Sequence, residues 1–325
     1  MRQAFLRSNF ENTMIKRTLY FGNPAYLSIA NSQLVIKLPE SEIVFTEKYL
    51  PPSANFKTIP IEDIGLVVID HRQITITSGV IDALLENNVA FVTCNSNRMP
   101  TGLLLPLTGN TLQNERFRSQ LDASLPLKKQ LWQQTIAQKI ANQGAVLKKN
   151  TKAECGCMQK WSNDVKSGDS MNLEARAAAY YWKNIFPSIP DFVRGREEDY
   201  PNNLLNYGYA ILRAVVARSL VGSGLLPTLG IHHQNRYNAY CLADDIMEPY
   251  RPFVDQLVID IMKERPDATV LTKEIKAKLL AIPVLDVIIK GKKSPLMIAA
   301  GITTASLSKC FEGTIRKIEY PEIEL

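Results

Sequence analysis

The stretch GIHHQNRYNAYCLADDIMEPYRP brings together side chains that can bind a divalent cation or transfer a proton. His232 and His233 are two of the three histidines in the chain, and the acids Asp244, Asp245 and Glu248 follow them. Imidazole suits Zn²⁺ well and carboxylate oxygens suit Mg²⁺ and Mn²⁺, so one such pair does not decide which metal would bind. The alternative interpretation is a set of ordinary polar residues around a turn and a helix start.

The acids of this stretch fall on a predicted helix. Asp245 and Glu248 are three residues apart, so their carboxylates project from one face, whereas Asp244 points roughly 100° away from Asp245. Pro249 removes a backbone donor and disfavours helical geometry at Glu248, which predicts a bend there. The bend would aim the Glu248 carboxylate away from its own helix. Acids early in a helix also complement its dipole and solvate its face, and spacing alone does not separate the two readings.

A metal site needs a further ligand, and the helical stretch SMNLEARAAAYYW offers Glu174. Ala177, Ala178 and Tyr181 share its helix face at the third, fourth and seventh positions onward. Small neighbours leave room beside the carboxylate for a bulky partner. They are equally consistent with close helix packing and a solvent-exposed Glu174.

Composition indicates a soluble, globular protein. A chain of 325 residues is too long for one small core, so two domains are expected. Hydrophobic residues make up 46% and charged residues 22%, and no apolar run reaches the roughly 18–20 residues that cross a bilayer. The first residues lack a signal-peptide core. Five cysteines, an odd number without an export signal, indicate reduced thiols, so we expect a cytoplasmic protein with no membrane partner.

Two of the cysteines form a CxC motif at Cys155 and Cys157. A structural zinc site usually needs four nitrogen or sulfur ligands, and no second pair of Cys or His stands nearby. We therefore expect a polar loop with two thiols. The whole segment KKNTKAECGCMQKWSNDVKSGDS is predicted to be a mobile loop.

Hydrophobic periodicity divides the chain into a strand-like and a helical part, which predicts an α+β fold. Two strands are expected around a hairpin turn at Asn31 and Ser32, and a single short helix with Ser78 as its N-cap. Later segments follow helical spacing, as in QLWQQTIAQKIANQGAVL. The predicted order is an extension or alternative start at 1–13, a β-rich N-terminal domain at 14–107, a linker at 108–112, and a larger, mainly α-helical C-terminal catalytic domain at 113–325.

The C-terminal segment IRKIEYPEIEL alternates apolar and charged residues. Such a pattern favours an added strand at a neighbouring sheet edge. A flexible tail is the alternative.

The net charge of +6 and isoelectric point near 8.9 are compatible with nucleic-acid binding, because basic groups attract a phosphate backbone. The basic clusters lie mostly in the middle of the chain, and solvated helix faces are the alternative for each cluster. Arg251 could equally contact a DNA phosphate or pair with Asp255. The candidate DNA-binding residues are Lys128, Lys129, Lys148, Lys149 and Arg251.

Three separated motifs carry a resemblance to a known family. NLEARAAAYYW, NNLLNYGYAILRAVVARSLVGSGLLPTLGIHH and YNAYCLADDIMEPYRPFVD occur in that order. Together they resemble the catalytic endonuclease and integrase subunit of the CRISPR spacer-acquisition complex. The likeness extends over nearly the whole chain, including TLYFGNPAYLSIANSQLVI, and points to the branch that works with a single large effector nuclease.

The resemblance implies a catalytic Mg²⁺ or Mn²⁺ ion held by Glu174, His233 and Glu248. Aligning GIHH with the Gly-x-x-His of the family selects His233 over the adjacent His232. Asp245 occupies a typical acidic position of the family. His232 and Asp245 are thus candidates for a supporting role, Asp245 as a second ligand or as a partner behind the ligands.

The resemblance also implies a reaction and partners. The family joins the 3′-OH of a short DNA fragment to a phosphodiester of the CRISPR repeat by transesterification. It works as two homodimers bridged by a small ferredoxin-like CRISPR-associated partner dimer, with contacts expected from the β-rich domain. The alternatives are a metal-dependent DNA nuclease or repair enzyme without integration, and a non-enzymatic DNA-binding assembly module.

Overall fold

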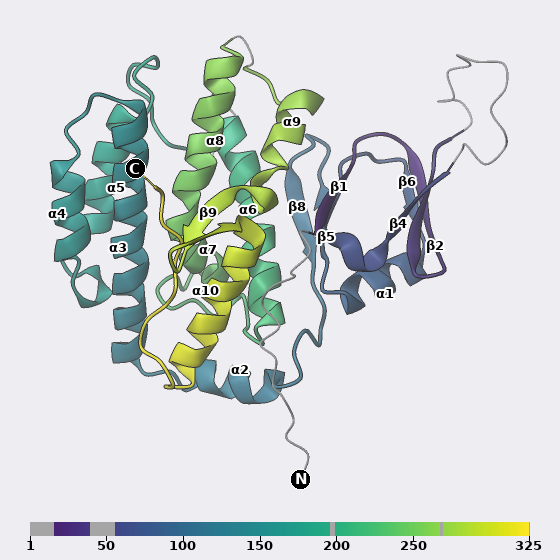
Figure 1. The fold of residues 1–325 in the computed structure, drawn as a ribbon, viewed down its shortest axis with the longest axis horizontal. Coiled ribbons are helices and arrows are strands. Elements are labelled where there is room, and N and C mark those ends of the chain that lie inside the picture. Colours follow the sequence, from purple (N-terminus) through teal and green to yellow (C-terminus); the bar gives the residue numbers. More distant parts are fainter. Residues whose placement is uncertain (1–15, 40–55, 196–198, 267–268, 325) are drawn as a thin grey trace.

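The computed structural model describes residues 16–39, 56–195, 199–266 and 269–324. A strand-rich N-terminal part lies at one end of the molecule, and a larger, mostly helical part forms the rest (Figure 1). The α+β prediction is therefore confirmed. The predicted extension at 1–13 lies outside the described residues. No helix among the described ranges has the length and apolarity to cross a bilayer.

The N-terminal part contains two four-stranded sheets within the described ranges. In the first sheet, β1, β5 and β7 are parallel and β8 is antiparallel to β7. The first sheet has the order β1 (Arg17–Phe21), β5 (Ile64–Ile69), β7 (Ala90–Cys94) and β8 (Pro100–Leu104). The second has the order β4 (Phe56–Pro60), β3 (Gln33–Lys37), β2 (Ala25–Ala30) and β6 (Ile74–Ile76).

The predicted hairpin and helix of this part are both present. Asn31 and Ser32 have φ values of 51° and 57°, as a two-residue hairpin turn between right-twisted strands requires. Helix α1 spans Ser78–Glu86. The prediction of its N-cap was wrong by one residue, because the carbonyl of Thr77 accepts the first helical bonds and Ser78 is already helical.

Strand β5 divides two hydrophobic cores. Val67 faces a core inside the N-terminal part, whereas Leu66 and Val68 face the core of the helical part. Successive side chains of a strand point to opposite faces, so the apolar run IGLVVI is buried on both sides. Ala90 and Val92 of β7 join the same shared core. The helical part thus packs directly on the first sheet, although loop and turn connect the two parts.

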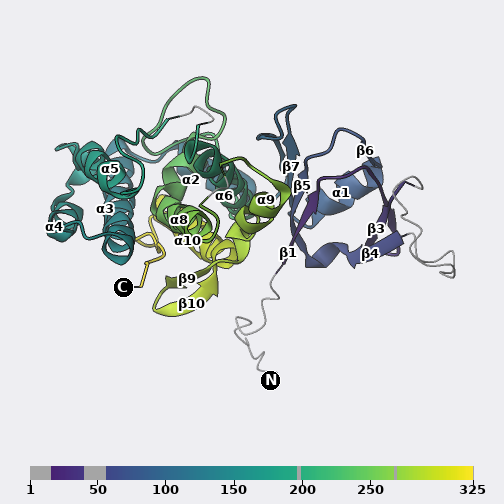
Figure 2. The same cartoon turned by 90° about the horizontal axis from the view of Figure 1, so that it is seen from above.

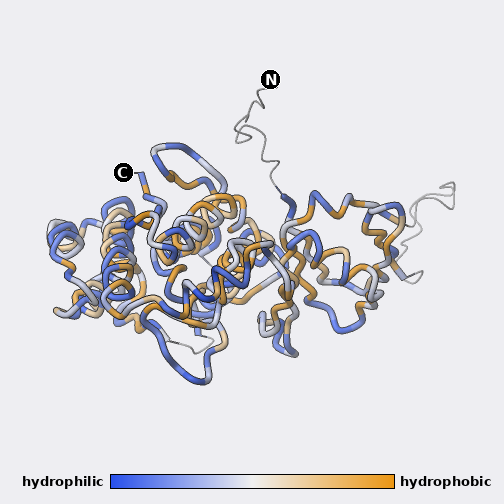
Figure 3. Tube along the Cα trace, turned by 90° about the horizontal axis from the view of Figure 1, so that it is seen from below, coloured by the Kyte–Doolittle hydropathy of each residue, from blue (hydrophilic) through white to orange (hydrophobic). Residues whose placement is uncertain are grey.

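Helix α6 forms the centre of the helical part, and most of its residues are buried around its whole circumference. Helices α3, α4 and α5 form the end farthest from the two N-terminal sheets (Figures 1 and 2). Hydrophobic segments gather inside both parts, and hydrophilic segments follow the outer loops (Figure 3). The helices are α2 (Gln113–Leu121), α3 (Leu125–Asn150), α4 (Gly156–Asp164), α5 (Leu173–Asn184), α6 (Asn202–Gly222), α7 (Cys241–Met247), α8 (Arg251–Glu264), α9 (Lys273–Leu279) and α10 (Leu296–Phe311).

Two local predictions for the helical part were incomplete. The segment predicted as a mobile loop around the CxC motif contains α4, because Met158 is fully buried and anchors that helix against α3 at Gly144. A hairpin of β9 (Asp286–Ile289) and β10 (Lys292–Pro295) was not predicted. Its turn residues Lys290 and Gly291 have φ values of 53° and 70°.

The C-terminal segment is held by its own chain. Gln134 Oε1 accepts a hydrogen bond from the backbone of Ile318 at 2.9 Å, and Asn142 Oδ1 accepts one from Ile323 at 3.2 Å. Glu322 forms an antiparallel bridge with Ile288 of β9. The C-terminal segment therefore lies at the edge of the β9–β10 sheet, as predicted, but it forms one bridge there and no full strand. The flexible-tail alternative was wrong.

Candidate functional site

Glu174 lies in the first turn of α5, and Asp169 caps this turn. The two carboxylate oxygens of Asp169 accept hydrogen bonds from the backbone nitrogens of Leu173 and Glu174, both at 2.9 Å. This arrangement satisfies donors that a helix N-terminus leaves free and places a negative charge at the positive end of its dipole. The Glu174 side chain retains 25% exposure and points toward α3, where its ion-pair partner lies.

Glu248 lies at an interruption of the helix, but its own backbone stays helical (φ −52°, ψ −47°), so the predicted loss of helical geometry at this residue was wrong. A short 3₁₀ segment, Glu248–Tyr250, separates α7 from α8 at Pro249. Asn142 of α3 donates a hydrogen bond of 2.8 Å to the carbonyl of Pro249, so the irregular backbone has a fixed partner. The Glu248 side chain is 5% exposed and points toward α3, where its ion-pair partner lies.

His233 precedes α7, and Asp245 fixes its ring. Asp245 Oδ1 lies 2.5 Å from Nδ1 of His233, and Asp245 Oδ2 accepts a hydrogen bond of 2.9 Å from the backbone of His232. Nδ1 is thereby engaged, so Nε2 is the ring nitrogen that remains for another ligand. The ring of His232 stacks on Trp132 of α3, with centroids 4.1 Å apart.

The pKa of His233 reports the surroundings of its ring. The hydrogen bond to Asp245 raises this pKa most, and burial opposes it. The charges of Glu248 and Glu174 raise the pKa further. The ring of His233 also lies edge-on to Trp132 of α3, with centroids 5.7 Å apart, so this histidine contacts the same helix toward which Glu174 and Glu248 point.

Lys139 of α3 stands between the two glutamates. Its Nζ lies 2.7 Å from Glu174 Oε1 and 2.6 Å from Glu248 Oε2, and its side chain is 10% exposed. Burial lowers the pKa of Lys139, but the charges of Glu248 and Glu174 outweigh burial and hold it above the ordinary value. Sequence reasoning missed this residue. The available signal was a lysine on the apolar face of a helix, beside Ile136 and Ile140.

The donor types of these side chains suit a divalent cation. Two carboxylates and one imidazole form a donor set that Mg²⁺ or Mn²⁺ accepts. Oε2 of Glu248 is buried and lies against the Lys139 ammonium, yet it receives no well-directed hydrogen bond. The ammonium thus occupies a cation position between the carboxylates. In this arrangement, no cluster of three or more His, Cys, Asp or Glu side chains among the described residues has metal-binding geometry.

Arg251 pairs with Glu248, a partner that the sequence did not indicate. Its Nη2 atom lies 3.1 Å from Glu248 Oε1, and its guanidinium lies over the ring of Tyr209. The predicted pairing with Asp255 does not form, because Tyr209 and Tyr181 donate hydrogen bonds of 2.5 and 2.9 Å to that carboxylate. Burial would raise the pKa of Glu248, but Arg251 and then Lys139 outweigh it and hold that pKa below its ordinary value.

The lysines predicted to contact DNA do not form a single patch. Lys128 and Lys129 lie near the start of α3, and Lys148 and Lys149 lie in its last turn. Twenty residues of helix separate the two pairs by about 30 Å. Any DNA that contacts both pairs must therefore run along α3.

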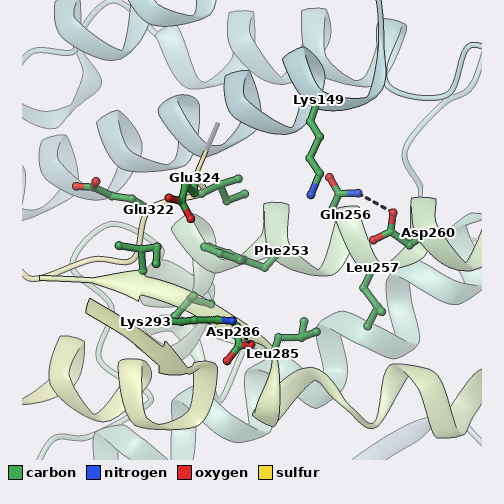
Figure 4. A pocket seen from close by; sticks show the side chains of 13 residues that line it. Lys149, Phe253, Gln256, Leu257, Asp260, Leu285, Asp286, Lys293, Glu322 and Glu324 are labelled. Atoms are coloured by element: carbon green, nitrogen blue, oxygen red, sulfur yellow. Dashed lines mark hydrogen bonds and ion pairs between the residues drawn. The ribbon is translucent and has the colours of Figure 1, made fainter. Parts of the chain in front are cut away.

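Lys149 lines a hollow that is separate from the candidate metal site (Figure 4). The hollow has a volume of about 470 Å³ and lies where α3, α8, the β9–β10 hairpin and the C-terminal segment meet. Phe253 lies at its centre, and Asp286 and Lys293 lie at its margin. None of the three predicted ligands lines this hollow.

The CxC motif lies at the start of α4. Cys155 and Cys157 donate weak hydrogen bonds to the carbonyls of Ala153 and Glu154. All five cysteines are free thiols, and no metal-binding cluster includes them among the described residues.

Comparisons with known proteins identify relatives. The profile of a family described as CRISPR associated protein Cas1 matches residues 20–280. The CRISPR-associated endonuclease Cas1 of Neisseria meningitidis serogroup C (strain 8013) is 35% identical over 268 residues, which cover 82% of this chain and 83% of the relative.

Two solved structures share the fold. A casposase bound to integration product has a TM-score of 0.75 and 19% identity, covering 95% of this chain and 94% of that chain. A chain of a Cas6-RT-Cas1–Cas2 complex has a TM-score of 0.71 and 19% identity, covering 99% of this chain and 38% of that one. At such identities the likeness concerns the fold alone.

Proposed function

The chain belongs to the Cas1 family of CRISPR-associated proteins, and from that membership we propose that it is a divalent-metal-dependent integrase and endonuclease of CRISPR adaptation. It joins the 3′-OH ends of short DNA fragments to the CRISPR repeat by transesterification. One observation supports the metal dependence: Glu174 and Glu248, from distant segments, both contact a single cationic group, Nζ of Lys139 on α3.

Glu174, His233 and Glu248 would hold Mg²⁺ or Mn²⁺. The bound ion would supply Lewis-acid stabilisation of the negative charge that gathers on the attacked phosphodiester. The hydrogen bond that Nδ1 of His233 donates to Asp245 keeps that nitrogen engaged and leaves Nε2 available to the site. Arg251 holds Oε1 of Glu248, which leaves Oε2 directed toward the cation position.

The partners are DNA, a second copy of this chain and a small ferredoxin-like partner dimer of the Cas2 type. The likeness to a chain of a Cas6-RT-Cas1–Cas2 complex supports the last of these. The casposase relative, bound to integration product, supports a DNA substrate.

A strand-transfer assay tests the proposal. The protein and its Cas2 partner are incubated with a fluorescent DNA fragment that ends in a 3′-OH and with a supercoiled plasmid that carries the repeat. We expect labelled plasmid with Mg²⁺ or Mn²⁺ and none with EDTA. Glu174→Gln, His233→Ala and Glu248→Gln should reduce the product below detection, whereas Asp164→Asn, at an exposed position of α4, should not. Undiminished strand transfer in all three site variants would instead favour a non-enzymatic assembly module.

A nuclease without integration is the second candidate, because the Neisseria relative is named an endonuclease. The same ligands would serve when water replaces the 3′-OH as nucleophile. Metal-dependent plasmid cleavage without any labelled plasmid, in the presence of the partner, would establish this alternative.

A further inference from the structure

The position of Lys139 in the candidate site suggests a role beyond packing. Its ammonium contacts one carboxylate from α5 and one from the 3₁₀ segment after α7. Ile136 and Ile140, both fully buried, hold this part of α3 in the core. The base of the lysine side chain is therefore fixed, whereas its four-carbon stem can still change rotamer.

Lys139 and Arg251 together balance the negative charges of Glu174 and Glu248. Arg251 neutralises Glu248 from the Oε1 side, and Lys139 approaches from the Oε2 side. Lys139 is the only cation in an ion pair with Glu174 among the described residues. Without Lys139, Arg251 would be the one cation paired with the two carboxylates among the described residues. The two negative charges would then repel each other.

A divalent ion and the ammonium cannot use the same oxygens at once. Oxygen ligands lie about 2.0–2.6 Å from Mg²⁺ or Ca²⁺, so an ion between Glu174 and Glu248 would occupy the space of Nζ. Two cations at that separation repel strongly in a buried site. Nζ must therefore withdraw from at least one carboxylate when an ion binds.

We propose that Lys139 is an internal counter-ion that competes with the divalent cation for Glu174 and Glu248. This inference rests on the proposed metal-dependent function. Lys139 holds the carboxylates together before the metal arrives and sets a threshold for metal binding. The site then fills only when the free cation is concentrated enough to displace the ammonium.

Metal binding by the full-length protein tests the competition without any DNA substrate. Isothermal titration with MnCl₂ would compare wild type, Lys139→Met and Lys139→Arg. Methionine removes the charge and keeps the length, so we expect Mn²⁺ affinity to rise by about tenfold or more, the scale on which one neighbouring charge affects proton binding. Arginine keeps the charge and pairs well with carboxylates, so affinity should equal or fall below that of wild type. Lys183→Met, at an exposed position of α5, is the control and should leave the affinity unchanged.

Thermal unfolding supplies a second readout. In EDTA, Lys139→Met should unfold at a lower temperature than wild type, and saturating Mn²⁺ should raise its midpoint more than that of wild type. A Lys139→Met variant that folds only with Mn²⁺ would also support the proposal.

The outcomes separate this inference from the proposed function. If wild type binds Mn²⁺ and Lys139→Met binds it equally or more weakly, the competition is refuted and the metal site stands. If Lys139→Met and Lys139→Arg both bind more tightly, charge competition is also refuted. If neither wild type nor Lys139→Met binds Mn²⁺, the metal-dependent function itself fails.

Discussion

Oδ1 of Asp245 lies 2.5 Å from Nδ1 of His233, and the Asp245 side chain is fully buried. This contact joins the first turns of α7 to the loop that precedes it. A carboxylate behind an imidazole fixes the ring orientation and makes the imidazole a better ligand. Asp245 should therefore affect metal binding through His233.

We predict that Asp245→Asn weakens Mn²⁺ binding and strand transfer by about 10–100-fold while the protein stays folded. The amide keeps the shape of the side chain but loses the charge that orients His233. Titration with MnCl₂ and the strand-transfer assay measure the two effects. Asp164→Asn serves as the matched control. Wild-type metal affinity in Asp245→Asn would show that this contact does not support the site.

Asp255 predicts a dependence of stability on pH. Burial raises its pKa to about 6, although Tyr209, Tyr181, Arg194 and Arg251 all favour the charged form. Because the folded pKa lies above the unfolded value, this carboxyl stabilises the fold at pH below about 4, and the contribution disappears as pH rises through about 6. The full change amounts to about 3 kcal/mol.

Unfolding of Asp255→Asn in denaturant between pH 4 and pH 7 measures this effect. The variant loses hydrogen bonds at every pH, but its stability should fall less than that of wild type as pH rises. Asp260→Asn, at an exposed position of the same helix, should follow wild type. Parallel curves for wild type and Asp255→Asn would contradict the assignment.

A buried ion pair joins the N-terminal part to the helical part. Nζ of Lys276 lies 2.9 Å from Oδ2 of Asp70, and their side chains are 3% and 0% exposed. We predict that Lys276→Met lowers the free energy of unfolding by up to about 3–5 kcal/mol, because buried Asp70 then loses its closest cation and keeps Tyr20 and the more distant, half-exposed Arg98 as partners. Lys278→Met, which removes an exposed pair with Glu264, should cost at most about 1 kcal/mol. Equal losses in the two variants would mean that burial does not decide the effect.

Asn142 links the 3₁₀ segment Glu248–Tyr250 to the C-terminal segment. Its Nδ2 atom donates hydrogen bonds of 2.8 Å to Pro249 O and 3.0 Å to Pro321 O. We predict that Asn142→Ala destabilises the protein by about 2–4 kcal/mol, because two carbonyl groups lose a buried donor. It should also weaken Mn²⁺ binding, since Glu248 begins the 3₁₀ segment that loses this hydrogen bond. Denaturant unfolding and metal titration test both points, and a stability loss with unchanged metal affinity would limit Asn142 to a structural role.

Local sequence patterns predicted the fold better than they predicted the contacts within the candidate site. The alternating and helical periods predicted the two parts, and Pro249 predicted the break between α7 and α8. The partner of Glu174 is Lys139, thirty-five positions earlier on another helix, and no local rule connects them. Arg251 pairs with Glu248, whereas Asp255 accepts hydrogen bonds from two tyrosines of other helices. Local spacing gave no sign of these tyrosines. Helical spacing records which faces are buried, but not which buried polar groups meet.

The two-sided burial of β5 has a mechanical consequence. Leu66 and Val68 belong to the core of the helices, while Val67 of the same strand belongs to the N-terminal core. Separating the two parts at the connecting loop would therefore expose apolar surface on both of them. A force that a bound protein exerts on the outer sheet would be transmitted through β5 to the helices. The two parts should therefore move together as a rigid body, without a hinge motion between them.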